Sequence, residues 1–299
     1  MFSKSKILIF LVLLHGSLAA PEWRNMRIHA DVSRLEGLSS VSGGPALYDG
    51  FVNVIIPSML KHLEESIQVK SELKMTIKAQ GCEAIKDIGV YLNQEIEADL
   101  VIFFVYSNKN DGTVASALDC HVDPLNKRPI AGVVDINVAT MDNVTQPYRN
   151  AHIATIIHEV YHILGFTSDY YDKFIDANGA IIAKSNVVKA VTSGKFSKMI
   201  VTPKVLAWAK TYYGCNTMDG VPLENNGDSG TAESHWEKFI AASEVMGPVD
   251  FNEVTMSGLT MSFLEDTGFY KLKWSMEENW EFGKGAGCTF ISGDCNAHP

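Results

Sequence analysis

Long hydrophobic segments and an excess of positive charge are both missing from this 299-residue sequence. No stretch approaches the 18 or so consecutive apolar residues that a membrane-spanning helix needs. The 25 basic and 35 acidic side chains give a net charge of -10, which argues against nucleic acid or an anionic membrane surface as a partner. The 23 glycines and 10 prolines are too few for a collagen-like or low-complexity chain. The five cysteines are an odd number, so at least one thiol lacks an internal partner.

The first 19 residues have the layout of a secretory signal peptide. Lys4 and Lys6 precede the short apolar run Ile7–Leu14, and small residues follow at Ser17 and Ala19. We therefore expect cleavage after Ala19 and a protein that is secreted or associated with the cell surface.

An oxidising compartment makes disulfides the expected state of the cysteines. In that compartment the sequon Asn143-Val144-Thr145 becomes a candidate glycosylation site at Asn143. The composition suits a soluble protein of one large domain or two subdomains, and we expect a monomer without a transmembrane span.

Hydrophobic periodicity predicts a mixed α/β (α+β) fold. We expect a sheet with two helices in the first half of the chain and a loop-rich second half. The predicted segments are helices at 46–68 (interrupted at Pro57), 147–164 and 255–266, and strands at 72–79, 99–106 and 130–138. Cys120 is expected in a polar connection between the last two strands.

The clearest chemical signal is His158-Glu159-Val160-Tyr161-His162 in the predicted helix 147–164. Histidines four residues apart lie on one face of a helix, so both imidazoles can reach one zinc ion. Glu159 can then act on a water at the metal without being a ligand. This helix is apolar on nearly every face, and burying such a cluster without a metal would be costly.

A third ligand has to come from elsewhere in the chain. Gly165 ends the helix, but Ser168 stands where the compact form of the motif has its third histidine. The downstream candidates are His235, Glu224, Glu233 and Glu237. Spacing alone leaves a histidine and a glutamate as alternatives.

Several segments resemble the leishmanolysin family of metzincin zinc proteases. They match in order along most of the chain: ALDCHVDPLNKRPIAGVVDIN (117–137), HEVYHILGF (158–166), GTAESHWEKFIAASEVMGPV (230–249), LEDTGFYKL (264–272) and GKGAGCTFISGDC (283–295). The resemblance implies a mixed sheet and active-site helix in an upper subdomain (20–165) and a loop-rich lower subdomain (166–299). It implies one Zn²⁺ per chain, with His235 as third ligand and Met246 as the Met-turn methionine beneath the metal.

The same resemblance implies a metalloendopeptidase that acts on proteins or peptides in an extended conformation. Glu159 would be the general base that activates water at a zinc held by His158, His162 and His235. Two alternatives remain: a zinc peptidase with a glutamate as third ligand, and a non-catalytic secreted or cell-surface adhesion protein that retains the fold.

The cysteines can be assigned in part. Cys82 and Cys120 flank the strand 99–106 and should pair, and the resemblance implies a pair of Cys215 with Cys288. Cys295 is then free, because the family places its partner in a further C-terminal domain. Since no cysteine precedes Cys82, we also expect no latency by a cysteine-bearing propeptide, and we expect the C-terminal domain and lipid anchor of the family to be absent.

Overall fold

The upper part of the molecule is built on a four-stranded sheet with the order β2-β6-β8-β7. The computed structural model describes residues 22–70, 72–82, 85–146, 148–192, 195–227, 230–248 and 254–292. Strands β2, β6 and β8 are parallel, and β7 pairs antiparallel with β8 at the edge. The strands are β1 (Arg24–Asn25), β2 (Ile28–Asp31), β3 (Ile67–Val69), β4 (Met75–Thr76), β5 (Glu95–Ile96), β6 (Leu100–Ser107), β7 (Ala115–Val122), β8 (Pro129–Asn137), β9 (Val188–Ala190), β10 (Lys198–Ile200), β11 (Val221–Pro222) and β12 (Tyr270–Leu272).

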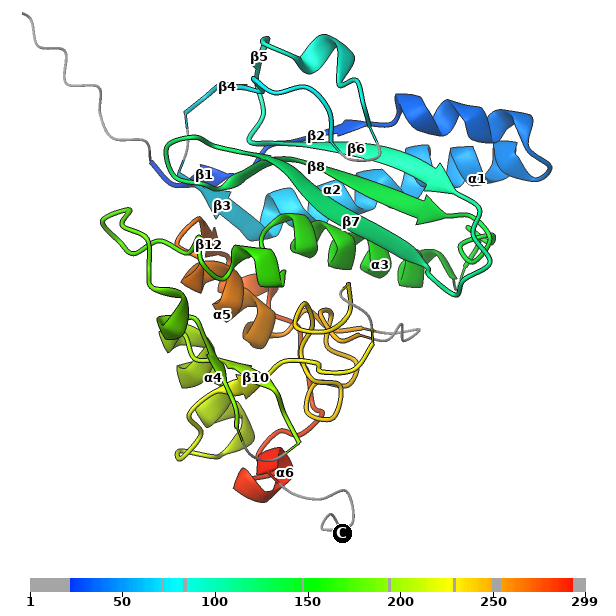
Figure 1. The fold of residues 1–299 in the computed structure, drawn as a ribbon. Coiled ribbons are helices and arrows are strands. Elements are labelled where there is room, and N and C mark those ends of the chain that lie inside the picture. Colours follow the sequence, from blue (N-terminus) through cyan, green and yellow to red (C-terminus); the bar gives the residue numbers. More distant parts are fainter. Residues whose placement is uncertain are drawn as a thin grey trace, which may run out of the picture.

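Helices α2 and α3 cover the lower face of this sheet (Figure 1). The α-helices are α1 (Gly44–Gly50), α2 (Ile56–Ser66), α3 (Tyr148–Ile163), α4 (Pro203–Tyr213), α5 (Gly258–Asp266) and α6 (Cys288–Ser292). The expected helix 46–68 is present as one continuous run, in which the π-helical turn Phe51–Ile55 joins α1 to α2 and Pro57 lies in the first turn of α2. Short 3₁₀ turns lie at Ser33–Ser40, Gly89–Tyr91, Ser168–Tyr170, Lys184–Asn186 and Trp274–Met276.

The main core begins between the sheet, α2 and α3 and continues into the lower part around α4 and α5. Ile102 and Val134 from the sheet are fully buried in the same cluster as Val160 and Ile163 from α3. The helix approaches the sheet closely at Gly132, where an added Cβ would lie 2.6 Å from a side-chain carbon of Ile163. The mixed α/β class is confirmed, as are the strands expected at 99–106 and 130–138 and the buried helix that follows them.

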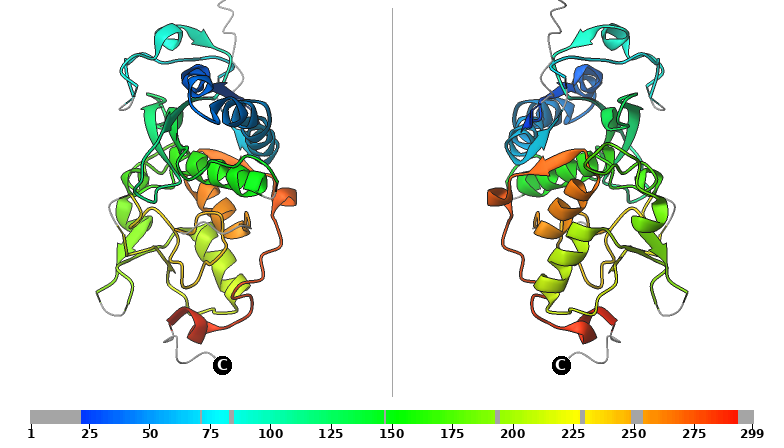
Figure 2. Two further views of the ribbon diagram at one scale, coloured as in Figure 1. Left: turned by 90° about the vertical axis from the view of Figure 1, so that its right-hand side faces the viewer. Right: turned by 90° about the vertical axis from the view of Figure 1, so that its left-hand side faces the viewer.

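A separate segment, residues 72–98, covers the opposite face of the sheet (Figure 2). It forms a small second core in which Ile77 and Ile88 pack against Val101 and Phe103 of β6. The strand expected at 72–79 is mostly wrong, because only Met75–Thr76 forms a strand and the side chain of Leu73 is 68% exposed.

Strand β7 corrects the expected position of Cys120. This residue lies within β7, at a bulge where Asp119 pairs with Gly132 and His121 with Ala131. There it forms the expected disulfide with Cys82, which ties the edge strand to the covering segment 72–98.

The lower part of the molecule contains α4, α5, α6 and the small sheet β11-β10-β9, connected by long loops. The expected disulfide between Cys215 and Cys288 joins the end of α4 to α6. Between α5 and α6 the chain returns to the upper part, where β12 pairs with β3.

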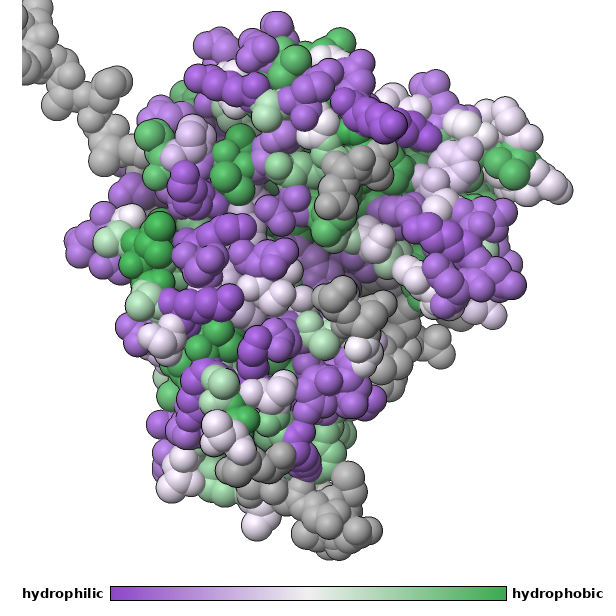
Figure 3. All heavy atoms as spheres, viewed as in Figure 1, coloured by the Kyte–Doolittle hydropathy of each residue, from purple (hydrophilic) through white to green (hydrophobic). Residues whose placement is uncertain are grey.

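Hydrophilic residues cover most of the face in Figure 3, and hydrophobic ones form small separate groups. None of the helices in the described part of the chain is both long and apolar enough to cross a membrane. The expected signal peptide and Cys295 lie outside the described residues.

Candidate metal centre

The first two histidines are positioned by α3 and by the way this helix ends. His158 and His162 are one helical turn apart, and Gly165 follows with a φ of 114°. The Gly165 N–H donates to the His162 carbonyl at 3.0 Å, and the Phe166 N–H donates to the Tyr161 carbonyl at 3.0 Å. This pair of bonds is the Schellman motif, in which a residue with positive φ lets the chain leave the helix sharply.

The helix end also orients an imidazole. The turn places the Phe166 carbonyl 2.7 Å from Nδ1 of His162. The Schellman motif therefore fixes both the direction of the chain and the ring of the second histidine.

The third histidine, His235, arrives from the lower part on a two-stranded ribbon. Leu223 and Trp236 form an antiparallel bridge, and the Glu224 N–H donates to the His235 carbonyl at 2.9 Å. The neighbouring Glu233 has a φ of 67° and forms an ion pair with Lys198 of β10. These contacts hold His235 against α3.

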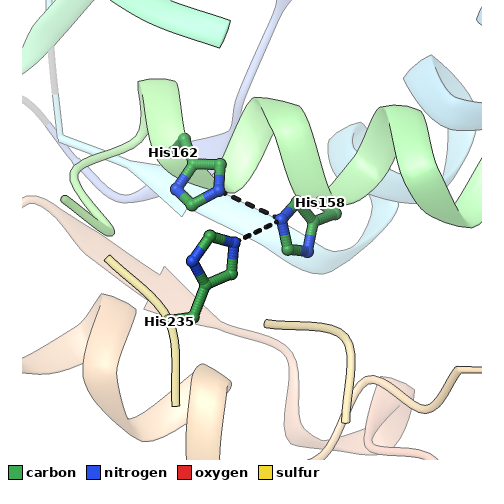
Figure 4. Close-up of side chains that lie close together, drawn as sticks. All are labelled: His158, His162 and His235. Atoms are coloured by element: carbon green, nitrogen blue, oxygen red, sulfur yellow. Dashed lines mark hydrogen bonds between the residues drawn. The ribbon is translucent and has the colours of Figure 1, made fainter. Parts of the chain in front are cut away.

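The three imidazoles meet through their Nε2 atoms (Figure 4). Nε2 of His158 lies 3.0 Å from Nε2 of His162 and 3.0 Å from Nε2 of His235. Among the described residues, these three histidines are the only group of three or more His, Cys, Asp or Glu side chains close enough to hold a metal ion.

The hydrogen bonds at Nδ1 determine the tautomer of each ring. Each Nδ1 faces a backbone carbonyl: Val245 for His158 at 2.6 Å, Phe166 for His162 at 2.7 Å and Thr231 for His235 at 2.9 Å. A carbonyl only accepts hydrogen bonds, so each Nδ1 carries the proton and each Nε2 presents a lone pair. Three lone pairs facing one another repel, and a cation at their meeting point removes that repulsion.

The surroundings keep these rings neutral, which is the state that binds metal. Burial lowers the pKa of His158 to about 4 and that of His235 to about 3. Burial, together with the two neighbouring histidines, lowers the pKa of His162 well below its usual value. The donor set therefore suits zinc, which binds neutral imidazole readily.

The remaining predicted residues lie around this group. Glu159 follows His158 in α3 and is 6% exposed. Met246 is fully buried in the main core, next to the Val245 carbonyl that accepts from His158, and its own carbonyl accepts from the Trp236 N–H at 3.0 Å.

The alternative carboxylate ligands have other partners. Glu224 accepts from the backbone N–H groups of Asn225 and Asn226, and Glu233 pairs with Lys198. Glu237 accepts from the Phe239 N–H at 3.3 Å. The structure brings His235, and none of these glutamates, to the other two histidines.

Two features lie outside the centre. The sequon residue Asn143 is partly exposed, and its Oδ1 accepts from the Thr145 hydroxyl at 2.6 Å. A cavity of about 1390 Å³, bordered by Trp23, Tyr270 and Trp274, contains none of the three histidines.

Sequence reasoning did not identify the carbonyl groups of Val245, Phe166 and Thr231 that orient the rings. These groups belong to the backbone, so no residue type marks them. The glycine at 165 was the only local signal for one of them.

Comparison with known proteins gives a consistent result. A family model described as leishmanolysin matches residues 48–298. The chain is 29% identical over 252 residues to a leishmanolysin homolog of Crithidia fasciculata, covering 83% of this chain and 37% of that protein. It is 28% identical over 253 residues to leishmanolysin of Leishmania chagasi, covering 83% of this chain and 40% of that protein. A leishmanolysin-like peptidase of Drosophila melanogaster is 29% identical over 213 residues, covering 61% and 31% respectively. The chain thus spans well under half the length of these relatives.

Proposed function

Because the chain belongs to the leishmanolysin family, we propose that it is a zinc-dependent endopeptidase that hydrolyses peptide bonds in proteins. The observation that carries this proposal is the convergence of three Nε2 lone pairs from His158, His162 and His235. The names of the relatives, which include peptidases, support it.

The three histidines would hold one zinc ion. When bound, zinc would supply a Lewis acid that lowers the pKa of a water toward about 7 and polarises the scissile carbonyl. The chain's part is to keep the imidazoles neutral and oriented. The three backbone carbonyls at Nδ1 do this, since they fix the tautomer that points Nε2 inward.

Glu159 would be the general base that transfers the proton of the attacking water. It follows the ligand His158 directly, so it lies about 100° further round the helix, beside the ligand face. In this role its carboxylate accepts a proton from the attacking water and passes it to the leaving amine nitrogen. The low exposure of Glu159 favours such a role, because a buried carboxylate exchanges protons with few competing waters.

The substrate would bind along β7 as an extended chain. In the described part of the molecule β7 pairs on one side only, with β8, and Figure 1 shows β7 running above α3. An extended peptide can add to such an edge through its main chain. Binding through backbone hydrogen bonds suits an enzyme that accepts many protein sequences.

The first test replaces the base. We expect Glu159→Ala to lower kcat for casein hydrolysis at least about 100-fold while one zinc per chain stays bound, because general-base catalysis contributes about 10²–10⁴-fold. A chelator should abolish the wild-type activity. If zinc-loaded Glu159→Ala keeps a large part of the wild-type rate, Glu159 is not the base.

The second test separates the ligands from other buried histidines. His235→Ala should lose bound zinc, whereas His152→Ala should retain it. His152 is the matched control, because it lies on α3 and is 8% exposed but bonds to the Asn143 carbonyl instead of joining the group. Equal zinc contents in the two variants would reject His235 as a ligand and reopen the glutamate alternative.

The same experiments address the adhesion alternative. A non-catalytic protein of this fold would bind zinc and still leave casein intact. We give priority to the peptidase, since both the ligand set and Glu159 are present.

Secretion, glycosylation and the division of the chain near Gly165 are part of the proposal. Expression in cultured eukaryotic cells should yield protein in the medium that begins after Ala19. Enzymatic removal of N-linked glycans should lower the mass of the wild type but not that of an Asn143→Gln variant. We also propose a monomer, which light scattering would test.

A further inference from the structure

A buried carboxyl group that the proposed mechanism does not use lies in the turn leading to Met246. This group belongs to Glu244, which is 1% exposed. Its Oε2 accepts from the Met246 N–H at 2.6 Å, and its Oε1 accepts from the Ser257 hydroxyl at 2.8 Å. A buried carboxylate is tolerated only when such bonds replace water, so both oxygens are engaged in fixed contacts.

The Met246 N–H and the Val245 carbonyl belong to one peptide group. On one side of this group the N–H meets the carboxylate of Glu244. On the other side the carbonyl accepts from Nδ1 of His158 at 2.6 Å. A single rigid peptide plane therefore links Glu244 to a predicted zinc ligand.

This link has two physical consequences for His158. Rotation of the peptide plane would break both hydrogen bonds, so the carboxylate holds the carbonyl in the orientation that His158 needs. Hydrogen bonds in a chain also polarise one another, so a negative charge at the N–H strengthens the carbonyl as an acceptor. A stronger acceptor at Nδ1 makes Nε2 a better metal ligand.

The carboxylate is itself anchored to a rigid base. The Ser257 hydroxyl that bonds to Glu244 also accepts from the Leu259 N–H at 3.1 Å and so caps α5. The Thr260 hydroxyl in the first turn of α5 bonds to the same carboxyl group and accepts from the indole N–H of Trp236 at 3.0 Å. Trp236 follows the predicted ligand His235, so Glu244 is connected to both sides of the centre.

We propose that Glu244 is a positioning residue of the metal centre, which orients and strengthens the ligand His158 through the peptide group 245–246. The proposal rests on the zinc function proposed above. It concerns a residue that touches neither metal nor substrate.

The test compares Glu244→Gln with the wild type in metal binding. The variant keeps the size of the side chain but loses its charge and one of its two acceptor oxygens. We expect zinc to bind about 10- to 100-fold more weakly, as is typical when a partner behind a ligand is removed. The visible spectrum of the cobalt-substituted protein should change, because it reports the geometry of the ligands. We also expect kcat to fall while KM stays near its wild-type value, since the substrate-binding edge is untouched.

A matched control separates positioning from general stability. Asp266→Asn removes a carboxylate that accepts from the backbone N–H groups of Lys204 and Val205 at 2.8 and 3.0 Å, at the start of α4. This variant should lose thermal stability yet bind zinc within about twofold of the wild type and keep its cobalt spectrum.

The outcomes are distinct. If Glu244→Gln binds zinc with wild-type affinity and an unchanged cobalt spectrum, the positioning role is wrong. Should that variant fail to fold, Ser257→Ala decides, because it removes one donor to the same carboxylate; unchanged affinity and spectrum in that variant would also refute the role. Failure of the wild type to bind zinc at all would refute the proposed function instead.

Discussion

Protonation of the proposed histidine ligands should reduce metal affinity little between about pH 7 and 5, although an ordinary histidine becomes protonated in that range. Protons compete with a metal for imidazole, so the affinity depends on the pKa of each ligand in the metal-free protein. Burial lowers the pKa of His158 to about 4 and that of His235 to about 3, and it lowers the pKa of His162 well below the usual value. In the metal-free protein, the rings of His158 and His235 therefore remain unprotonated at pH 5.

The expected size of the effect follows from these values. An imidazole with an ordinary pKa of about 6.5 is protonated at pH 5, and each such ligand lowers the affinity about 25-fold relative to pH 7. Three independent rings would lower it about 10⁴-fold. With the pKa of His158 at about 4 and that of His235 at about 3, the same change in pH lowers the affinity less than about twofold through these two rings.

Calorimetric titration of the metal-free Glu244→Gln variant with zinc at the two pH values measures this difference. The variant is used because burial raises the pKa of Glu244 to about 7, so this carboxylate would itself become protonated in the wild type. Circular dichroism should first establish that the metal-free protein is folded at pH 5. A peptide of residues 148–166 is the matched control, because its histidines, which include the ligand pair His158 and His162, are exposed and should lose affinity steeply. A loss of 100-fold or more in the folded protein would show that the rings titrate normally, and hence that the centre is not preorganised.

Four further predictions concern stability and are checked by thermal or urea unfolding. Replacing Cys82 and Cys120 by alanine should cost up to about 4 kcal/mol, as expected for opening a loop with a sequence separation of 38. Gly165→Ala should cost at least about 1–2 kcal/mol, since the φ of 114° is unfavourable for any residue with a Cβ. Burial raises the pKa of Glu244 from 4.5 to about 7, so its protonated form stabilises the fold fully below about pH 4.5, and this contribution is lost as the pH rises through 7. Relative to Glu244→Gln, the wild type should lose up to about 3 kcal/mol of unfolding free energy between pH 5 and 8. Removing zinc with a chelator should lower the unfolding free energy by about 4 kcal/mol where free zinc had been about 1,000-fold above its Kd.

The sequence predicted those elements whose residues carry a strong local pattern. Strands β6 and β8 are continuous apolar runs covered on both faces, and α3 combines helical spacing with the histidine pair. Strand β7 was missed because it lies at the edge of the sheet, where only partial burial is required and the residues ASALDCHV show little hydrophobic alternation. The strand expected at 72–79 has the alternation, but only Met75–Thr76 finds a partner strand, β5, and the rest of the segment is held by a small core and a disulfide instead.

Helix geometry, the family resemblance and the residue types each predicted a different part of the site. The pair His158 and His162 follows from helix geometry alone. His235 has no local signature, and only the family resemblance selected it, because its position depends on the ribbon formed with residues 223–224. The role of the 245–246 peptide group had no signal in the sequence, since any residue supplies the same carbonyl and N–H.

The origin of the ligands gives the centre a structural role as well. His158 and His162 belong to α3, which packs under the upper sheet. His235 is held by the ribbon in the lower part, where the neighbouring Glu233 forms an ion pair with Lys198. The turn at 244–246 also contacts both parts. The Val245 carbonyl accepts from His158 of α3, and the Met246 carbonyl accepts from the Trp236 N–H of the ribbon. A metal bound by all three histidines would therefore join the two parts at the point where a substrate chain would lie along β7.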